Sequence, residues 1–209
     1  MKGRILQAAR EEYLRLGFSG VTTDGIAASI GISKATLYRY FSSKEQLCRE
    51  VLFYLLQEVE SGIDALIKDR GLEFARKLAG ILSFMGLELA KMSGLCTIDL
   101  QRNAPGIWKE VEAFRQERIL SKLKLILSQG LKSGDFRGDI DQDFLILLYV
   151  TIIQEIMNPA TLVRFSLSFP EAFRMIISMM VEGILTEKGR TRYRAASRPR
   201  SGKGLRRPR

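Results

Sequence analysis

The stretch from Thr22 to Lys44, TTDGIAASIGISKATLYRYFSSK, constrains the fold of this chain more than any other. Apolar residues recur at helical spacing from Ile26 to Ile30, Gly31 interrupts the pattern, and a second helical set follows from Leu37 to Phe41. This pattern predicts two short helices joined by a glycine-containing turn. Such helix pairs also occur in ordinary helical bundles, so the residues around the turn decide what the pair does.

The residues at the ends of these helices favour a helix-turn-helix, in which the first helix braces the second against DNA. Thr23 is suited to cap the first helix, Gly31 to adopt a left-handed turn, and Ser33 to cap the second helix. The second helix, about 12 Å long, matches the width of the major groove of B-DNA. It carries polar side chains that suit phosphates and base edges, at Lys34, Thr36, Tyr38 and Arg39.

Beyond this general pattern, the run GISKATLYRYFSSKEQL, preceded by a paired threonine and by Ile-Ala, resembles the amino-terminal DNA-binding domain of TetR-family transcriptional regulators. The resemblance covers about residues 4 to 52, and it is specific because the Thr-Thr, Gly-Ile-Ser, Tyr-x-Tyr-Phe and Ser-Lys elements keep the family spacing. The rest of the chain resembles the family only in length and helical character. The resemblance implies an all-α fold with a three-helix DNA-binding domain, followed by a helical domain for effector binding and dimerisation.

The resemblance also implies particular DNA contacts. The positions that match the family's contact residues are Thr23, Lys34, Ala35, Thr36, Tyr38, Tyr40 and Lys44. The capping Ser33 and the charged Arg39 complete the predicted DNA-binding set, although Arg39 is equally consistent with a solvated surface charge. Lys34 suits a guanine or a phosphate, and Ala35 suits a thymine methyl group. The other side chains suit contacts to the DNA backbone.

The net charge of +10 does not by itself support DNA binding, because it is concentrated at one end of the chain. Ten basic residues and no acidic residue follow Glu187, so the other 23 basic residues equal the 23 acidic ones. Residues 1–50 hold eight basic and five acidic side chains, a modest positive bias at the helix-turn-helix. The basic tail, residues 188–209, is rich in glycine, serine, proline and arginine, and we expect it to be disordered.

The sequence predicts about nine helices in total. Besides the two helices of the helix-turn-helix, we expect helices at about residues 2–16, 43–68, 72–92, 97–101, 107–132, 141–159 and 168–187. The run FLILLYVTII has strand propensity, but no partner strand is predicted elsewhere, so a helix is the better interpretation. We expect a DNA-binding domain at residues 1–46 and an effector-binding and dimerisation domain at residues 47–187.

The helices expected at about residues 141–163 and 168–187 carry broader apolar faces than one small bundle needs. In the family that the chain resembles, two such helices pair with their copies from a second subunit, so the resemblance implies a homodimer. A dimer places two reading helices on a palindrome with half-sites about 34–36 Å apart. In the alternative interpretation, both helices complete a monomeric core.

A small-molecule effector, largely apolar, is also implied by the resemblance. Large and adaptable side chains of the second domain are candidates to line its pocket. They are Phe84, Met85, Met92, Trp108, Phe114, Tyr149 and Met157. Methionines and aromatic residues at helical spacing are also typical of an ordinary core, so this set is less specific than the DNA-binding set.

Other classes of function have little support. Histidine is absent, and Cys48 and Cys96 are too few for a disulfide framework or a zinc site made of cysteines alone. Four aspartates between residues 135 and 143 lack glutamate or histidine partners on facing helices, so we expect no metal, no cofactor and no enzymatic activity. The longest apolar run is about ten residues, too short for a membrane span. With no amino-terminal apolar signal, we expect a cytoplasmic protein.

The sequence therefore predicts a DNA-binding transcriptional regulator, most simply a repressor that a small molecule releases from a palindromic operator. The alternative is a non-specific or architectural DNA-binding protein that uses the basic tail. The first hypothesis depends on the second helix of the helix-turn-helix, whereas the alternative depends on the charge of residues 188–209.

Overall fold

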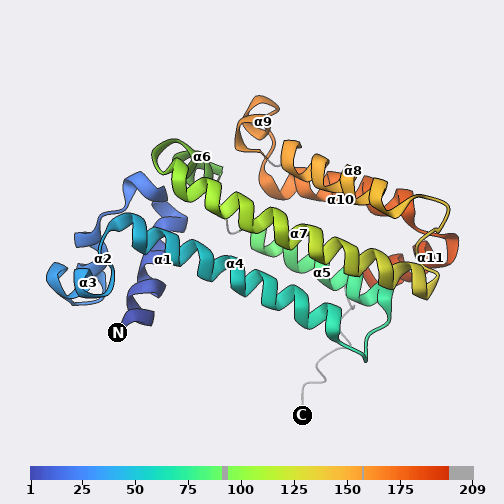
Figure 1. Ribbon diagram of the computed structural model, residues 1–209, viewed down its shortest axis with the longest axis horizontal. Helices are drawn as coiled ribbons and strands as arrows, with labels where there is room; N and C mark the ends of the chain where they lie inside the picture. Colours follow the sequence, from blue (N-terminus) through green and yellow to red (C-terminus); the bar gives the residue numbers. More distant parts are fainter. Residues whose placement is uncertain (91–93, 157, 198–209) are drawn as a thin grey trace, which may run out of the picture.

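The chain folds into α-helices, as the spacing of its apolar residues predicts. The computed structural model describes residues 1–90, 94–156 and 158–197, and this part of the chain forms eleven helices and no strand (Figure 1). They are α1 (Lys2–Gly20), α2 (Thr23–Ser29), α3 (Lys34–Tyr40), α4 (Lys44–Lys68), α5 (Phe74–Ala90), α6 (Gly94–Asn103), α7 (Pro105–Ser133), α8 (Gln142–Ile156), α9 (Pro159–Arg164), α10 (Phe169–Ile184) and α11 (Glu187–Ser197). The predicted all-α class is confirmed, and the sequence-based expectation of about nine helices lacks α9 and α11.

Helices α2 and α3 form the predicted helix-turn-helix. Gly31 has a φ angle of 68°, the left-handed geometry expected of it. The amide of Ile32 donates a hydrogen bond to the carbonyl of Ala27, which closes the turn. Ser33 caps α3, because its hydroxyl accepts a hydrogen bond from the amide of Thr36 at 3.1 Å.

The cap of α2 lies one residue earlier than predicted. Thr22, and not Thr23, fills this place, and its hydroxyl accepts a hydrogen bond from the amide of Gly25 at 3.0 Å. Thr23 is the first residue inside the helix, and its side chain is buried. Two adjacent threonines offer the same hydroxyl to a helix start, so only the packing of the folded chain distinguishes them.

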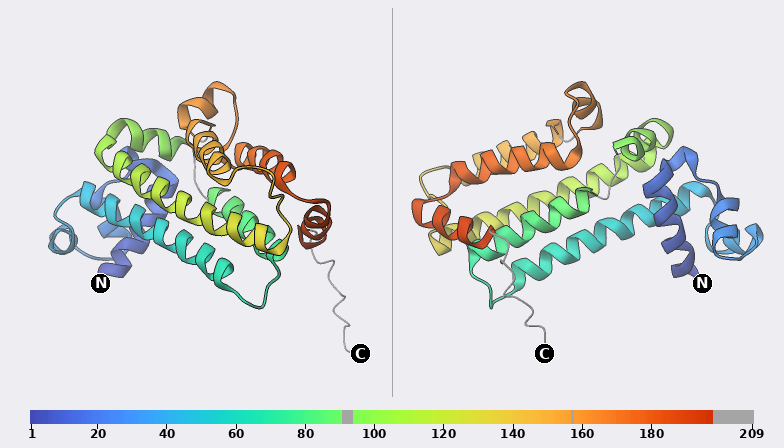
Figure 2. Two further views of the ribbon diagram at one scale, coloured as in Figure 1. Left: turned by 45° about the vertical axis from the view of Figure 1, so that its right-hand side comes forward. Right: turned by 180° about the vertical axis from the view of Figure 1, so that it is seen from behind.

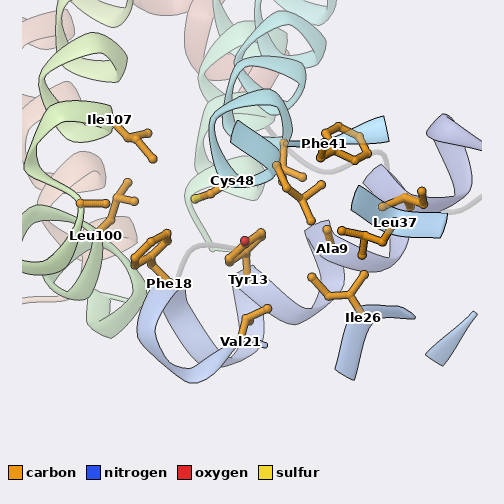
Figure 3. Close-up of a cluster of buried hydrophobic side chains, with 14 of the residues drawn as sticks. Ala9, Tyr13, Phe18, Val21, Ile26, Leu37, Phe41, Cys48, Leu100 and Ile107 are labelled. Carbon is orange, nitrogen blue, oxygen red and sulfur yellow. The ribbon is translucent and has the colours of Figure 1, made fainter. Parts of the chain in front are cut away.

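Helix α1 breaks at Gly17, where φ is 75° and ψ is 179°, and then continues for one further turn. The sequence predicts the break, since a glycine is the usual residue at a helix end, but it does not predict the extra turn. Phe18, in the extra turn, is buried between Tyr13 and the side chains of Leu100 and Ile107 from α6 and α7 (Figure 3).

Helix α4 connects the two ends of the molecule. It begins beside α3 and runs along the molecule against α5 and α7 (Figures 1 and 2). Ser43 caps its first turn by accepting a hydrogen bond from the amide of Gln46 at 3.1 Å. The side chain of Gln46 reaches back past this cap and accepts a hydrogen bond from the amide of Ser42 at 2.5 Å.

Buried apolar side chains form two clusters. The first cluster lies among α1, α2, α3 and the start of α4. It includes Leu100 of α6, Ile107 and Val111 of α7, and Ala104 between these two helices. The second cluster lies among α5, α7, α8 and α10. Helices α6 and α7 therefore contribute to the core of the helix-turn-helix end, so that end is not packed independently of the rest.

Helices α8 and α10 each bury one face and expose another. The run FLILLYVTII lies within α8, which confirms the helical interpretation. At the start of α10, Ser168 and Glu171 form a capping box, in which the side chain of each residue accepts a hydrogen bond from the amide of the other. The outer faces carry large apolar side chains with high exposed fractions, namely Phe144 at 57%, Leu147 at 64%, Met175 at 54% and Met179 at 75%. Within the described residues, no helix is long and apolar enough to cross a membrane.

The prediction of a disordered tail is wrong for residues 188–197, which form most of α11. Gly189 is buried against the backbone of Asp135, so closely that a Cβ atom at this position would lie 2.1 Å from the carbonyl oxygen of Asp135. Composition fails as a guide here because the segment on which α11 packs lies far away in the sequence. Residues 198–209, which the prediction also covers, lie outside the described residues.

Candidate nucleic-acid interface

Helix α3 presents polar side chains at its surface because its apolar residues point inward. Leu37 in α3 and Phe41 directly after it are fully buried in the first core. The exposed residues of this segment are Lys34, Ala35, Tyr38, Arg39 and Tyr40. The helix lies at one end of the molecule, remote from α8, α10 and α11 (Figure 1). Its exposed face is therefore open to a large partner such as a DNA duplex.

Tyr38 and Thr23 are joined across the two helices of the motif. Their hydroxyl oxygens lie 3.3 Å apart, within hydrogen-bonding distance. The side chain of Thr23 is only 7% exposed, whereas that of Tyr38 is 39% exposed. The structure therefore places Thr23 behind Tyr38, where it orients the phenol hydroxyl instead of presenting its own hydroxyl to a partner.

Lys34, in the first turn of α3, forms an ion pair with Asp24 of α2. The Nζ atom of Lys34 lies 2.8 Å from a carboxylate oxygen of Asp24, and both side chains are more than half exposed. The hydrogen bond to Asp24 raises the pKa of Lys34, so this group stays a cation. An exposed pair of this kind is weak, so Lys34 is free to exchange its carboxylate partner for a ligand.

The hydroxyls of Ser33 and Thr36 serve the start of α3. They lie 3.0 Å apart, and the Ser33 hydroxyl also accepts the Thr36 amide. Ser33 is exposed and Thr36 is half-buried. Both residues lie beside Lys34 in the first turn, so a partner that touches Lys34 also meets these hydroxyls.

Lys44, at the start of α4, is held over an aromatic ring. Its Nζ atom lies 4.5 Å from the centroid of the Phe18 ring, a cation–π contact. The Phe18 ring in turn stacks on Tyr13 with a centroid distance of 6.4 Å. The Tyr13 hydroxyl donates a hydrogen bond to the backbone carbonyl of Lys44 at 3.3 Å. Both ends of Lys44 are thus supported by the final part of α1.

Sequence reasoning missed the residues that position the predicted contacts. Asp24 is an acidic residue in a segment expected to be positive, so its charge gave no reason to include it. Phe18 is typical of a core residue, and the sequence contains no signal that a lysine 26 positions away lies on its ring. Asp24 and Phe18 are found only when helices from different parts of the chain are placed together.

The structure does not bring the described members of the predicted effector-pocket set together at one place. Trp108 packs on the first core, whereas Tyr149 belongs to the second, where its hydroxyl donates to the carbonyl of Met180 at 3.0 Å. Burial raises the pKa of Tyr149 to about 12, so this hydroxyl stays protonated. Two further residues face α4. Phe84 lies against Gly62, and Phe114 contacts Phe53 edge-on with a centroid distance of 5.4 Å.

Of the other pocket residues, Met85 is half-buried on α5, and Met92 and Met157 lie outside the described residues. A polar pair that the sequence did not single out lies beside Phe114 on α7. Arg115 forms an ion pair with Glu112 at 2.8 Å, and the side chains are only 25% and 19% exposed. Within the described part of the chain, the buried Nε atom of Arg115 has no hydrogen-bond partner. It is a donor that a bound polar group could satisfy.

Known proteins share this arrangement. Residues 5–51 match the model of the tetR family of bacterial regulatory proteins. The chain is also 27% identical over 190 residues to YvaF, an uncharacterized HTH-type transcriptional regulator of Bacillus subtilis. That similarity covers 90% of this chain and 97% of YvaF, so it extends well beyond the helix-turn-helix.

Solved structures have the same fold. A TetR-family transcriptional regulator from Agrobacterium tumefaciens matches with a TM-score of 0.66 at 19% identity, over 88% of this chain and 97% of that chain. The regulator FadR from Bacillus subtilis, solved in complex with stearoyl-CoA, matches with a TM-score of 0.60 at 20% identity, over 88% and 100% of the two chains. At these identities the likeness establishes the common fold.

Proposed function

We propose that this chain is a TetR-family transcriptional regulator, a sequence-specific repressor that a small molecule releases from a palindromic operator. The match of residues 5–51 to the tetR-family model and the similarity to YvaF support this proposal. The observation that carries this proposal is α3. Its buried Leu37 and its Ser33 cap fix a short helix whose exposed face carries Lys34, Ala35 and Tyr38. A helix of this length fits the major groove of B-DNA.

The proposed contacts follow from the geometry of α3 and the start of α4. Lys34 reaches a guanine or a phosphate, and Ala35 packs on a thymine methyl group. Tyr38, oriented by Thr23, binds a phosphate through its hydroxyl. The backbone contacts come from Lys44 and the tyrosine that ends α3, Tyr40. Ser33, Thr36 and Arg39 supply the remaining polar contacts.

We further propose that α8 and α10 form a homodimer with their copies in a second subunit. Their outer faces expose large apolar side chains such as Leu147 and Met179, which a monomer leaves in water. A two-fold interface of this kind gives two copies of α3 in one particle. Two reading helices double the number of base pairs that are read and explain why the operator would be palindromic.

The effector site is proposed to lie in the second domain, where α4 meets α5 and α7. Phe53, Phe84 and Phe114 supply apolar surface there, and Arg115 supplies a hydrogen-bond donor. Because α4 also carries Lys44, a ligand that prefers a different tilt of α4 lowers the population of the DNA-binding arrangement.

The proposal assigns binding and no catalysis to the chain. Among the described residues, no group of three or more cysteine, aspartate or glutamate side chains could hold a metal ion. The sequence has no histidine to act as a general base. A repressor works where the chromosome lies, so the proposal places the protein in the cytoplasm of a bacterium.

The alternative function, non-specific DNA binding by the basic tail, is disfavoured by α11. Arg190 and Arg194 lie 2.7 and 3.2 Å from carboxylate oxygens of Glu182, and Arg192 lies 3.3 Å from one of Asp135. Each of these three arginines thus pairs with a carboxylate of the body of the protein. Helix α11 also lies at the opposite end of the molecule from α3 (Figure 1).

Selection of binding sites from random DNA duplexes tests the proposed function. The full-length protein is expected to enrich a palindrome whose half-sites are centred about 10 base pairs apart. A variant that ends at Ser197 is expected to enrich the same sequence. If folded full-length protein enriches no sequence, the proposed function is wrong, and if the shortened variant loses all DNA binding, the alternative is right.

The dimer is tested by sedimentation of the variant L147E/M179E, which places charges on both exposed apolar faces. The wild type is expected to sediment as a dimer and this variant as a monomer with weakened operator binding. A matched control is L125E, which changes a leucine on α7 that is 46% exposed and lies outside the proposed interface. A monomeric wild type, or a dimeric L147E/M179E variant, contradicts the proposed interface.

A further inference from the structure

The break in α1 leaves backbone amides that need a partner. At Gly17 the backbone adopts φ 75° and ψ 179°, a conformation open almost only to glycine. The turn that follows begins at Phe18 and Ser19, and the first amides of any helical turn lack acceptors within the helix. The residue that would cap this turn locally is Gly17, which has no side chain. The cap therefore has to come from elsewhere.

The cap comes from α6. A carboxylate oxygen of Asp99 accepts a hydrogen bond from the amide of Ser19 at 2.7 Å, across 80 residues of sequence. The side chain of Asn103, one turn later on α6, donates to the other oxygen of Asp99 at 2.7 Å and fixes its orientation. Burial alone would raise the pKa of Asp99, but these hydrogen bonds outweigh it and hold the pKa below its usual value.

The missing side chain at Gly17 is what admits this carboxylate. A Cβ atom at Gly17 would lie 2.9 Å from an oxygen of Asp99, closer than real Cβ atoms approach such a neighbour. Glycine therefore serves two purposes here, because it allows the unusual backbone angles and it leaves space for the cap. Helices α1 and α6, from the two predicted domains, are joined at this point by a specific and charged contact.

The capped turn also supports a proposed DNA contact. Phe18 lies in this turn, and its ring carries the ammonium group of Lys44 at 4.5 Å. The Phe18 ring also belongs to the buried cluster that includes Leu100 of α6 and Ile107 of α7 (Figure 3). A continuous set of contacts thus runs from Asp99 on α6, through the turn at Phe18, to Lys44 at the start of α4.

We propose that Asp99 is a positioning residue for DNA binding, which caps the broken end of α1 and so keeps the Phe18 ring beneath Lys44. Through this contact, the position of α6 in the second domain sets the affinity of the reading surface. This inference rests on the proposed function, because it assumes that Lys44 binds a DNA phosphate. A shift of α6 that withdraws Asp99 releases the turn and with it the lysine.

The test compares D99A with D99N in the full-length protein, using fluorescence anisotropy on the operator selected by the wild type. D99A is expected to weaken operator binding about three- to tenfold, because the turn loses its cap. D99N keeps an oxygen that accepts the Ser19 amide, so it is expected to stay within about twofold of the wild type. A matched control is E110A, which removes an exposed ion pair between α7 and Arg49 of α4 at 2.7 Å. It is expected to leave binding unchanged.

A double-mutant cycle separates positioning of Lys44 from a general structural role. K44A is expected to flatten the salt dependence of binding by about one charge, and D99A is expected to weaken binding no further in the K44A background. If D99A proves unfolded, F18L replaces it, since leucine keeps an apolar side chain but removes the ring beneath Lys44. If D99A or F18L lowers operator affinity by the same factor with and without Lys44, the inference is wrong. It is also wrong if folded D99A binds the operator with wild-type affinity. A wild type without any operator overturns the proposed function instead.

Discussion

Two basic helices lie at opposite ends of this molecule, and they differ in what holds their charges. In α11, Arg190, Arg192 and Arg194 are all bound to carboxylates of α10 or of the segment after α7. In α3, Lys34 has a single exposed partner on the neighbouring α2, and Arg39 is exposed. Helix α11, which has more basic residues than α3, thus has its arginines in ion pairs within the protein.

The difference shows that the sign of a charge is a poor guide to a DNA-binding surface. Arg192 pairs with Asp135, whose side chain is 2% exposed, so its partner is an integral part of the protein interior. Lys34 and Asp24 are both solvated, and a pair of this kind contributes little to the stability of the fold. A cation that the fold holds weakly is available to a ligand, whereas a cation that compensates a buried charge is not. We therefore expect substitutions in α11 to change the stability of the fold and substitutions in α3 to change DNA binding.

The largest effect is expected from G189A, which acts on α11. An added Cβ atom would lie 2.1 Å from the carbonyl oxygen of Asp135, a backbone atom that cannot rotate away, so α11 has to move. We expect a loss of roughly 3 kcal/mol in the free energy of unfolding, measured by urea denaturation. The control is G106A on α7, where an added Cβ atom meets nothing within 4 Å. Equal stability of G189A and the control would show that α11 does not pack as described.

The second effect is on binding. K34A is expected to weaken operator binding about tenfold or more while leaving binding to random DNA within about threefold, because a base contact carries sequence information. The free energy of unfolding is expected to stay close to that of the wild type, since the ion pair with Asp24 is solvated. Anisotropy titrations on operator and random duplexes measure both affinities. A uniform loss on both duplexes would make Lys34 a phosphate contact.

The third effect is expected from R192M in α11, which is the converse of K34A because it lowers stability and leaves DNA binding unchanged. R192M keeps much of the side-chain volume but leaves the Asp135 carboxylate with one fewer donor, the hydroxyl of Ser133 being retained at 2.8 Å. We expect a loss of about 1 kcal/mol in the free energy of unfolding, since Arg192 is itself partly exposed. Operator affinity is expected to equal that of the wild type. Weaker operator binding by a variant of unchanged stability would give α11 the role that we assign to α3.

Local signals explain how much of this fold could be predicted from the sequence. The left-handed turn at Gly31 and the cap of α3 by Ser33 follow from the chemistry of these two residues alone. The turn and the cap both occur as expected. These features depend on neighbours within a few residues, which a single sequence displays.

Long-range partners explain why the rest could not be predicted. The fit of Gly189 against Asp135 gives α11 its order, and the two residues are 54 positions apart. The cap that Asp99 supplies to Ser19 spans 80 positions. In the site, the exposed set on α3 could be placed from the sequence, whereas Asp24, which holds one of its members, could not. Composition and periodicity contain no information about which distant side chain fills a local gap.

The smallest effect is expected from D24N, which frees Lys34 from its partner on α2. The free lysine is expected to bind a phosphate on any duplex, which raises affinity for random DNA about two- to fivefold and steepens its salt dependence by about one charge. Operator binding gains less, because on the operator the wild-type Lys34 already exchanges Asp24 for its base contact, so the ratio of operator to random affinity falls.

The control for D24N is D69N, which removes the same charge at the far end of α4, where the side chain accepts a hydrogen bond from the amide of Gly71 at 2.7 Å that asparagine retains. Anisotropy titrations at several salt concentrations measure the slopes for both variants. D69N is expected to leave the ratio of affinities unchanged. If both variants change the ratio equally, net charge alone governs binding, and the distinction between α3 and α11 drawn from their ion pairs does not hold.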